Sequence, residues 1–228
     1  MYWKGFLMLN LAILIPCKNE EKTIRQVIRD CQKELPQAEI FVGDNNCTDN
    51  TKAVAEDCGV TVIPCPISGK GAALKVMIRK VKADKYLFID GDGTYSARDG
   101  KMLLDKMIHT PHCAMAIGDR RKQYFVENQS LFHALGNRLV PYLVAKKCHA
   151  RSVDVMSGLR IVTRAFLLKY PIQSDDFTVE TELTMNLFCS RQPYVTEDIS
   201  YHDRQKGSRS KICSIKDGRK IIMWILKH

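Results

Sequence analysis

Tyr86-Leu87-Phe88-Ile89-Asp90-Gly91-Asp92 is the stretch of sequence that decides the fold. Its first four residues are apolar, as a strand requires when helices cover both faces of its sheet. The acidic triplet then ends the apolar run, and Asp and Gly are also common turn residues. The stretch therefore predicts a buried strand whose carboxyl end carries two carboxylates around one glycine.

The same alternation of a short apolar run and an amphipathic segment repeats outward from this stretch. Further strands are expected at 11–15, 40–43, 60–63 and 114–117, and helices at 21–35, 50–58, 69–83 and 98–108. Such alternation predicts an α/β, Rossmann-like fold with a mostly parallel sheet and helices on both faces. In sheets of this kind ligands bind beyond the carboxyl ends of the strands.

The second half of the chain is less regular. Helices are expected at 131–147, with an interruption near Pro141, and at 179–190, and extended segments at 159–162 and 194–203. A basic, partly apolar helix is expected at the end of the chain. No linker divides the 228 residues, which predicts a single domain.

Composition and charge exclude several classes of protein. Of the residues, 45% are hydrophobic and 26% charged, which excludes disordered and fibrous chains. The net charge of +10 suits phosphorylated substrates or an anionic membrane leaflet. Only 8% of residues are aromatic and no nucleic-acid-binding module occurs, so no nucleic-acid partner is expected.

Cysteine spacing and the lengths of apolar runs predict the compartment. The nine cysteines are irregularly spaced without a CxxC pair, which predicts free thiols in a reducing compartment. No apolar run approaches the roughly 20 residues of a membrane helix. We therefore expect a cytoplasmic protein.

The triplet at 90–92 is the strongest candidate for a metal site. Asp90 and Asp92 can both face one hard divalent cation, Mg²⁺ or Mn²⁺, while Gly91 lets a ligand come close. The alternative is an ordinary polar turn.

Other polar residues lie where strands end or helices begin. Asp44 and Asn45 follow a strand, and could hold a base or ribose or belong to the turn before the next helix. Lys70 opens a helix between two glycines, where a phosphate can approach. Glu180 and Glu182 begin another helix, either as general-base candidates or as partners of the helix dipole. Basic segments around Arg160 and Arg204, the latter continuing through Ser208 and Lys211, are either phosphate sites or solvated loops.

The order of these motifs resembles family-2 glycosyltransferases, which have the GT-A fold. The motifs that match their nucleotide-sugar half are Pro16-Cys17-Lys18-Asn19-Glu20, Asp44-Asn45, Gly69-Lys70-Gly71 and Asp90-Gly91-Asp92. Later motifs are similar to the branch of dolichol- and polyprenyl-phosphate sugar synthases. They are Gly118-Asp119-Arg120, Ser157-Gly158-Leu159-Arg160, Glu180-Thr181-Glu182-Leu183, and Arg204 with Ser208 and Lys211. The resemblance spans residues 11 to about 220.

The resemblance implies a role for each matching residue. The donor-binding residues are Pro16, Asn19, Glu20, Asp44, Asn45, Lys70, Asp90, Gly91 and Asp92, of which Asp90 and Asp92 hold the metal. The acceptor-side residues are Arg120, His133, Arg160, Ser208 and Lys211. The catalytic residues are Asp92, Glu180, Glu182 and Arg204. Residues 11–120 are then the nucleotide-sugar half, 121–213 the acceptor half, and 214–228 a C-terminal basic amphipathic helix.

The implied reaction is an inverting, metal-dependent transfer of a sugar from a UDP- or GDP-linked donor to a polyprenyl or dolichyl phosphate. A saccharide hydroxyl remains open as the acceptor, and would need a base such as Glu180 or Glu182. A non-catalytic nucleotide-sugar-binding protein is the alternative of another class. For a lipid acceptor we expect peripheral association with the inner face of the membrane. Helix 214–228 then lies either on that membrane or on the core.

Overall fold

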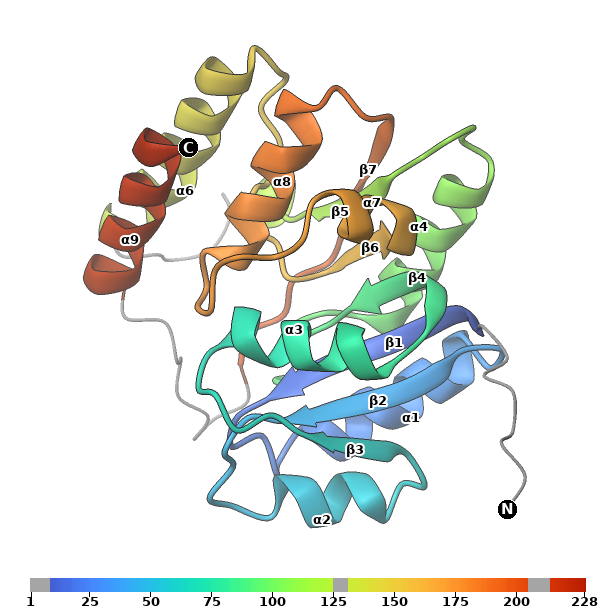
Figure 1. The fold of residues 1–228 in the computed structure, drawn as a ribbon. Coiled ribbons are helices and arrows are strands. Elements are labelled where there is room, and N and C mark those ends of the chain that lie inside the picture. Colours follow the sequence, from blue (N-terminus) through green and yellow to red (C-terminus); the bar gives the residue numbers. More distant parts are fainter. Residues whose placement is uncertain (1–8, 125–130, 205–213) are drawn as a thin grey trace.

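The computed structural model describes residues 9–124, 131–204 and 214–228, and Figure 1 shows its ribbon. Within these ranges seven strands form one sheet in the order β3-β2-β1-β4-β6-β5-β7. The strands are β1 Leu9–Cys17, β2 Glu39–Asp44, β3 Thr61–Pro64, β4 Ala83–Phe88, β5 Met115–Asp119, β6 Arg160–Thr163 and β7 Tyr194–Asp198. The helices are α1 Ile24–Glu34, α2 Thr51–Glu56, α3 Lys70–Lys80, α4 Ala97–Ile108, α5 Arg121–Tyr124, α6 Leu131–Cys148, α7 Arg164–Lys169, α8 Val179–Cys189 and α9 Ser214–Lys227.

Strand β1 lies near the middle of the sheet and is apolar on both faces. Its residues Leu11, Ile13 and Ile15 belong to one buried cluster, and Ala12 and Leu14 to the other. Helices α1 and α4 cover the first face, whereas α3, α7 and α8 cover the second, with α6 and α9 packed side by side next to α8. This arrangement confirms the α/β fold with a mostly parallel sheet and helices on both faces.

Strand direction brings the polar motifs to one edge of the sheet. β1 pairs in parallel with β2 and β4, and β5 pairs in parallel with β7. β6 is antiparallel to both β4 and β5, so its amino end lies at the edge where β4 and β5 have their carboxyl ends. The segment before β6 therefore joins the residues that follow β1, β2, β4 and β5.

The helices at the C-terminal side differ in part from the expectation. Pro141 lies inside α6 and does not interrupt it, because Val140 and Val144 on either side are buried in the core. The short helix α7 was not anticipated. Ile221 and Ile225 of α9 are buried, so the last helix packs on the core. No described helix has the length and apolar character needed to cross a bilayer.

The expectation of free thiols is wrong for one pair of cysteines. Cys148 ends α6, Cys189 ends α8, and the two form a disulfide with a Cα–Cα distance of 4.9 Å. The pair lies 41 residues apart in sequence, and only the packing of α6 against α8 brings it together. The remaining described cysteines are free thiols: Cys17, Cys31, Cys47, Cys58, Cys65 and Cys113.

Candidate active site

A buried lysine links two of the predicted site residues. Asp90 follows β4 and forms an ion pair with Lys70, the first residue of α3. The Lys70 ammonium also lies 2.6 Å from a carboxylate oxygen of Glu180 on α8. Burial alone lowers the pKa of Lys70, but the carboxylates of Asp90 and Glu180 outweigh burial and raise that pKa above its ordinary value. Lys70 is therefore a permanent cation between two carboxylates.

Asp92 is buried and held on both of its oxygens. Its Oδ1 accepts hydrogen bonds from the Thr94 hydroxyl at 2.7 Å and the Thr94 amide at 3.1 Å. Its Oδ2 lies 2.5 Å from Nη2 of Arg204. The other terminal nitrogen of Arg204, Nη1, is buried and has no hydrogen-bond partner among the described residues. A buried donor that points to no protein acceptor is available to an oxygen of a ligand.

The donor set at Asp90 and Asp92 fits Mg²⁺ or Mn²⁺ shared with a phosphorylated ligand. Mg²⁺ is usually held in proteins by one or two carboxylates, with waters and substrate phosphates in its other positions. The described ranges contain no group of three or more His, Cys, Asp or Glu side chains placed to bind a metal alone. The orphaned nitrogen of Arg204, whose other terminal nitrogen pairs with Asp92, matches a metal that binds together with phosphate.

The ends of β1 and β2 are bound to each other by side chains. Asn19 has the left-handed φ of 56°, and its Oδ1 accepts a hydrogen bond from the Thr48 amide at 2.7 Å. Oδ1 of Asp44 accepts one from the Cys47 amide at 2.9 Å. Pro16 lies next to this region at the end of β1. Of the predicted nucleotide residues, Pro16, Asn19, Glu20 and Asp44 thus gather at one place on the sheet edge.

The side chain of Asn45 is engaged by the loop that precedes α3. Its Nδ2 donates to the carbonyls of Cys65 and Ile67 at 3.0 and 2.6 Å, and its Oδ1 accepts from the amide of Gly69 at 2.8 Å. All three bonds fix the loop that leads into α3. The two bonds to carbonyl oxygens need N–H donors, which an amide side chain supplies and a carboxylate does not.

The packing of Gly91 gives a structural reason for a glycine at this position. A Cβ atom there would lie 2.5 Å from Sγ of Cys17, and the Gly91 carbonyl accepts a hydrogen bond of 2.7 Å from the hydroxyl of Thr23. The glycine therefore allows the turn after β4 to pack against β1.

Arg120 forms the wall of the site on the β5 side. Its guanidinium binds Asp154 through two bonds of 2.6 and 3.0 Å and lies 5.1 Å from the ring centroid of Tyr201. Tyr201 packs edge-on against Tyr95, whose hydroxyl accepts a hydrogen bond from the Gly158 amide at 2.8 Å. This chain of contacts connects the end of β5 to the segment before β6.

Two residues predicted to contact the acceptor or to act as a base are committed elsewhere. Arg160 is fully buried and donates to the carbonyls of Ser157 and Glu180. It therefore orients α8 and cannot reach an acceptor. Glu182 is also fully buried and accepts hydrogen bonds from the amides of residues 173 and 174, so both of its oxygens hold a loop and neither is free to take a proton.

Three predicted residues cannot be placed from the structure. Ser208 and Lys211 lie outside the described residues. His133 belongs to α6, but its side chain also lies outside the described part of the structure.

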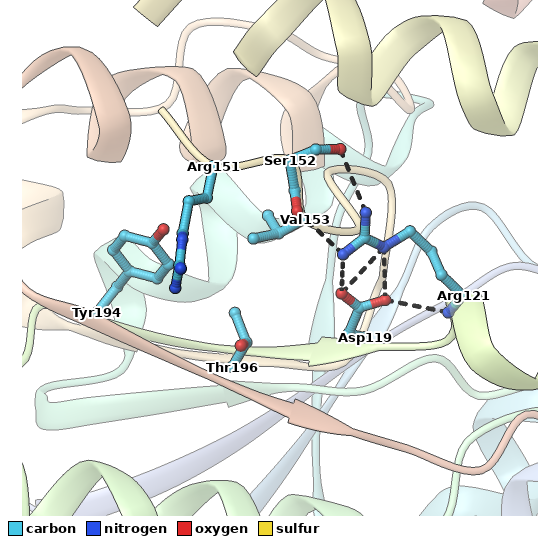
Figure 2. Close-up of a pocket in the computed structure, with 7 residues that line it drawn as sticks. All are labelled: Asp119, Arg121, Arg151, Ser152, Val153, Tyr194 and Thr196. Carbon is cyan, nitrogen blue, oxygen red and sulfur yellow. Dashed lines mark hydrogen bonds and ion pairs between the residues drawn. The ribbon is translucent and has the colours of Figure 1, made fainter. Parts of the chain in front are cut away.

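A polar pocket beyond Arg120 was missed by the sequence analysis. In Figure 2, Asp119 binds the guanidinium of Arg121, which also reaches Ser152, while Arg151 and Tyr194 lie on the opposite side of the pocket. Asp119 lies in the predicted motif 118–120 and Arg121 directly follows it, so this motif was the signal of the pocket in the sequence.

Fold and site together define an enzyme class. A mostly parallel sheet whose edge presents Asp90 and Asp92, with Lys70 and Arg204 beside them, has its polar residues where open α/β sheets bind ligands. Residues 12–167 match the glycosyl transferase family 2, and the chain belongs to that family. It is therefore a glycosyltransferase that uses nucleotide sugars.

Two relatives show how far the similarity extends. The protein RfbJ of Shigella flexneri is 43% identical over 113 residues, which cover 50% of this chain and 87% of RfbJ. The glycosyltransferase AglJ of Haloferax volcanii is 33% identical over 221 residues, which cover 96% of this chain and 71% of AglJ.

Solved structures share the fold at lower identity. Glucosyl-3-phosphoglycerate synthase of Mycobacterium tuberculosis is 20% identical with a TM-score of 0.76, and the match covers 96% of this chain and 80% of that one. A structure of that synthase with Mn²⁺, UDP and phosphoglyceric acid has a TM-score of 0.79 at 19% identity, with 96% and 78% covered.

Proposed function

We propose that this glycosyltransferase moves a sugar, with inversion, from a UDP- or GDP-linked donor to a polyprenyl or dolichyl phosphate. One observation carries the choice of acceptor. Glu180 is paired with Lys70 through Oε1, and both carboxylate oxygens of Glu182 hold a loop, so both candidate bases are engaged in other contacts. A phosphate acceptor is already anionic and attacks without a base, whereas a sugar hydroxyl needs one.

The donor would bind at the edge formed by β1, β2 and β4. Asp90 and Asp92 would hold Mg²⁺ or Mn²⁺, which supplies charge stabilisation for the departing diphosphate. The glucosyl-3-phosphoglycerate synthase that shares this fold was crystallised with Mn²⁺ and UDP, which supports this assignment. Asn19, Glu20 and Asp44 form the nucleoside end, and Nη1 of Arg204 is a donor for a phosphate oxygen.

A basic and apolar face of α6 and α9 supports membrane association. Exposed apolar side chains on these two helices are Leu139, Tyr142, Met223 and Leu226. Exposed cations on the same helices are Arg138, Lys146, Lys147, Lys216, Arg219, Lys220 and Lys227. Such a surface suits an anionic bilayer, where a lipid phosphate lies. In Figure 1 this helix pair lies on the side to which β1 and β2 point with their carboxyl ends.

Asp92→Asn tests the metal assignment. We expect transfer to fall by at least about a hundredfold, because a neutral amide loses the charge that holds the cation. In a thermal-shift assay, stabilisation by UDP or GDP with Mn²⁺ should also disappear. Asp57→Asn, at an exposed ion pair with Arg25, is the matched control and should behave as the wild type. Full activity of Asp92→Asn in Mn²⁺ would contradict the assignment.

The acceptor is tested with labelled UDP- and GDP-sugars offered to polyprenyl phosphate in detergent or to a soluble saccharide. We expect label in the organic phase only with the lipid phosphate. Transfer to the saccharide alone would refute the lipid acceptor while leaving the donor chemistry intact.

Flotation with vesicles tests the membrane face. The protein should float with vesicles that contain anionic lipid and not with neutral ones, and high salt should weaken the binding. Met223→Ser/Leu226→Ser should reduce flotation. Ile108→Ser, an exposed apolar residue on α4 of the opposite helical layer, is the control. Equal flotation of both variants would argue against this face.

A further inference from the structure

Two glutamates of α8 lie close to Lys70 or to the loop that packs against it. Glu180 contacts the lysine directly, at 2.6 Å from its ammonium, and both side chains are more than nine-tenths buried. Glu180 is in turn fixed through its backbone, because its carbonyl accepts a hydrogen bond of 3.0 Å from the fully buried Arg160. The carboxylate is thereby presented to Lys70 from a rigid element.

Glu182 acts on the same region through a loop. Its two carboxylate oxygens accept hydrogen bonds from the amides of Gln173 and Ser174 at 2.6 and 2.9 Å, and the Ser174 hydroxyl donates to it as well. A buried carboxylate that accepts three hydrogen bonds fixes the backbone that donates them. The loop before α8 therefore has one defined position.

This loop touches the first turn of α3 with its backbone. A Cβ atom at Gly69 would lie 2.1 Å from the carbonyl oxygen of Asp175, and one at Gly71 would lie 2.3 Å from that of Ser174. Only glycine on each side of Lys70 permits such close contact. Any shift of the loop therefore shifts the backbone that carries the lysine.

The space around the Lys70 ammonium is closed on its third side by Gly158. A Cβ atom there would lie 2.9 Å from Nζ of Lys70 and 2.5 Å from Oδ2 of Asp90. The ion pair between lysine and aspartate thus fits between α8 and the backbone before β6. Asp90 therefore pairs with a cation that a second carboxylate, that of Glu180, also contacts.

We propose that Glu180 and Glu182 are positioning residues that place Lys70, and that Lys70 in turn orients the Asp90 carboxylate for the donor with its metal. The inference rests on the proposed function in one respect, the binding of a nucleotide diphosphate with a divalent cation at Asp90. It assigns one shared role to Lys70, which lies between two glycines, and to the two glutamates of α8. Neither glutamate removes a proton from the acceptor.

Calorimetric titration of UDP and of GDP in Mn²⁺ tests the proposal. We expect Glu180→Gln to weaken nucleotide binding by about tenfold, the effect of losing one charge-assisted contact. Lys70→Met should weaken it at least as much. The double variant should bind no more weakly than Lys70→Met alone, because residues that act through one another are not additive. Glu182→Gln should weaken binding in the same direction.

The melting temperature of each variant shows whether it is folded, and a matched surface variant is the control for nucleotide affinity. Glu197→Gln, at a surface ion pair of 2.7 Å with Lys106, should leave nucleotide affinity unchanged. Wild-type affinity in a folded Glu180→Gln that has lost transfer would identify a base and overturn the proposal, as would additive losses in the double variant. If Glu182→Gln does not fold, Glu180→Gln and Lys70→Met still test whether the glutamate positions the lysine. A wild-type chain that binds neither nucleotide would overturn the proposed function itself.

Discussion

Replacing Gly158 by alanine tests the geometry of the site with a single methyl group. Gly158 precedes β6, and its amide donates to the Tyr95 hydroxyl at 2.8 Å. The added Cβ would lie 2.5 Å from Oδ2 of Asp90 and 2.9 Å from Nζ of Lys70. Atoms in van der Waals contact lie about 3.5 Å apart, so the carboxylate must retreat by roughly 1 Å and the ammonium by roughly half an ångström.

The size of the effect on sugar transfer depends on which of the two side chains, Asp90 or Lys70, is displaced. Lys70 is held by Glu180, so Asp90 takes most of the displacement. Overpacking of a filled interior costs about 1–3 kcal/mol of stability. A displacement approaching 1 Å at a reacting centre costs up to about a hundredfold in rate. We therefore expect Gly158→Ala to remain folded, with a lower melting temperature and transfer reduced by about ten- to a hundredfold.

Gly218→Ala is the matched control, because nothing lies within 4 Å of a Cβ at that position of α9. Alanine in a helix should there stabilise the fold slightly. The assay compares melting temperature, Mn²⁺-dependent UDP or GDP binding and sugar transfer in both variants. Wild-type nucleotide binding and transfer in Gly158→Ala would refute the tight fit around Asp90 and Lys70.

Two further predictions concern stability. The pKa of Asp154 would be raised by burial, but Arg120 outweighs burial and holds it below its ordinary value of 3.8, so the pair stabilises the fold fully above that pH and loses its effect as the pH falls through the lowered pKa. Urea unfolding of Asp154→Asn should therefore show a loss of about 3–5 kcal/mol at pH 7 that shrinks below pH 4, and a loss independent of pH would contradict this. Reduction of the bond between Cys148 and Cys189 should cost about 2–4 kcal/mol in the free energy of unfolding. Thermal melts with and without a reductant should differ for the wild type but not for Cys148→Ser, and an unchanged wild-type melt would refute the disulfide.

The sequence predicted the fold well where local pattern and burial agree. The apolar run 86–89 could only be a covered strand, and the polar triplet after it had to lie at the ligand-binding edge. The same logic brought Asp44 and Asn19 to that edge. The short helix α7 has too few residues to show a helical periodicity in the sequence. Pro141 wrongly predicted an interruption of α6, because the packing of α6 outweighs the tendency of proline to break a helix.

Roles of individual side chains were predictable only in part, because they depend on contacts between distant segments. Asn45 and Arg160 have the polar groups that a ligand site needs, yet each turns inward to hold a loop or a helix. Glu180 and Glu182 look equivalent in sequence but face a lysine and a loop, respectively. The disulfide depended on a helix pairing across 41 residues, which spacing alone does not encode.

The insertion of β6 between β4 and β5 affects how this chain acquires its structure during synthesis. β4 and β5 are made early but have no bond to each other, because β6 supplies the pairing on both sides. Until residue 163 has left the ribosome, the growing sheet ends at β4 with an unpaired edge, a surface prone to association with other chains. Completion of the sheet beside β4, and of the contacts that join Lys70 to Asp90 and Glu180, therefore waits for the second half of the chain.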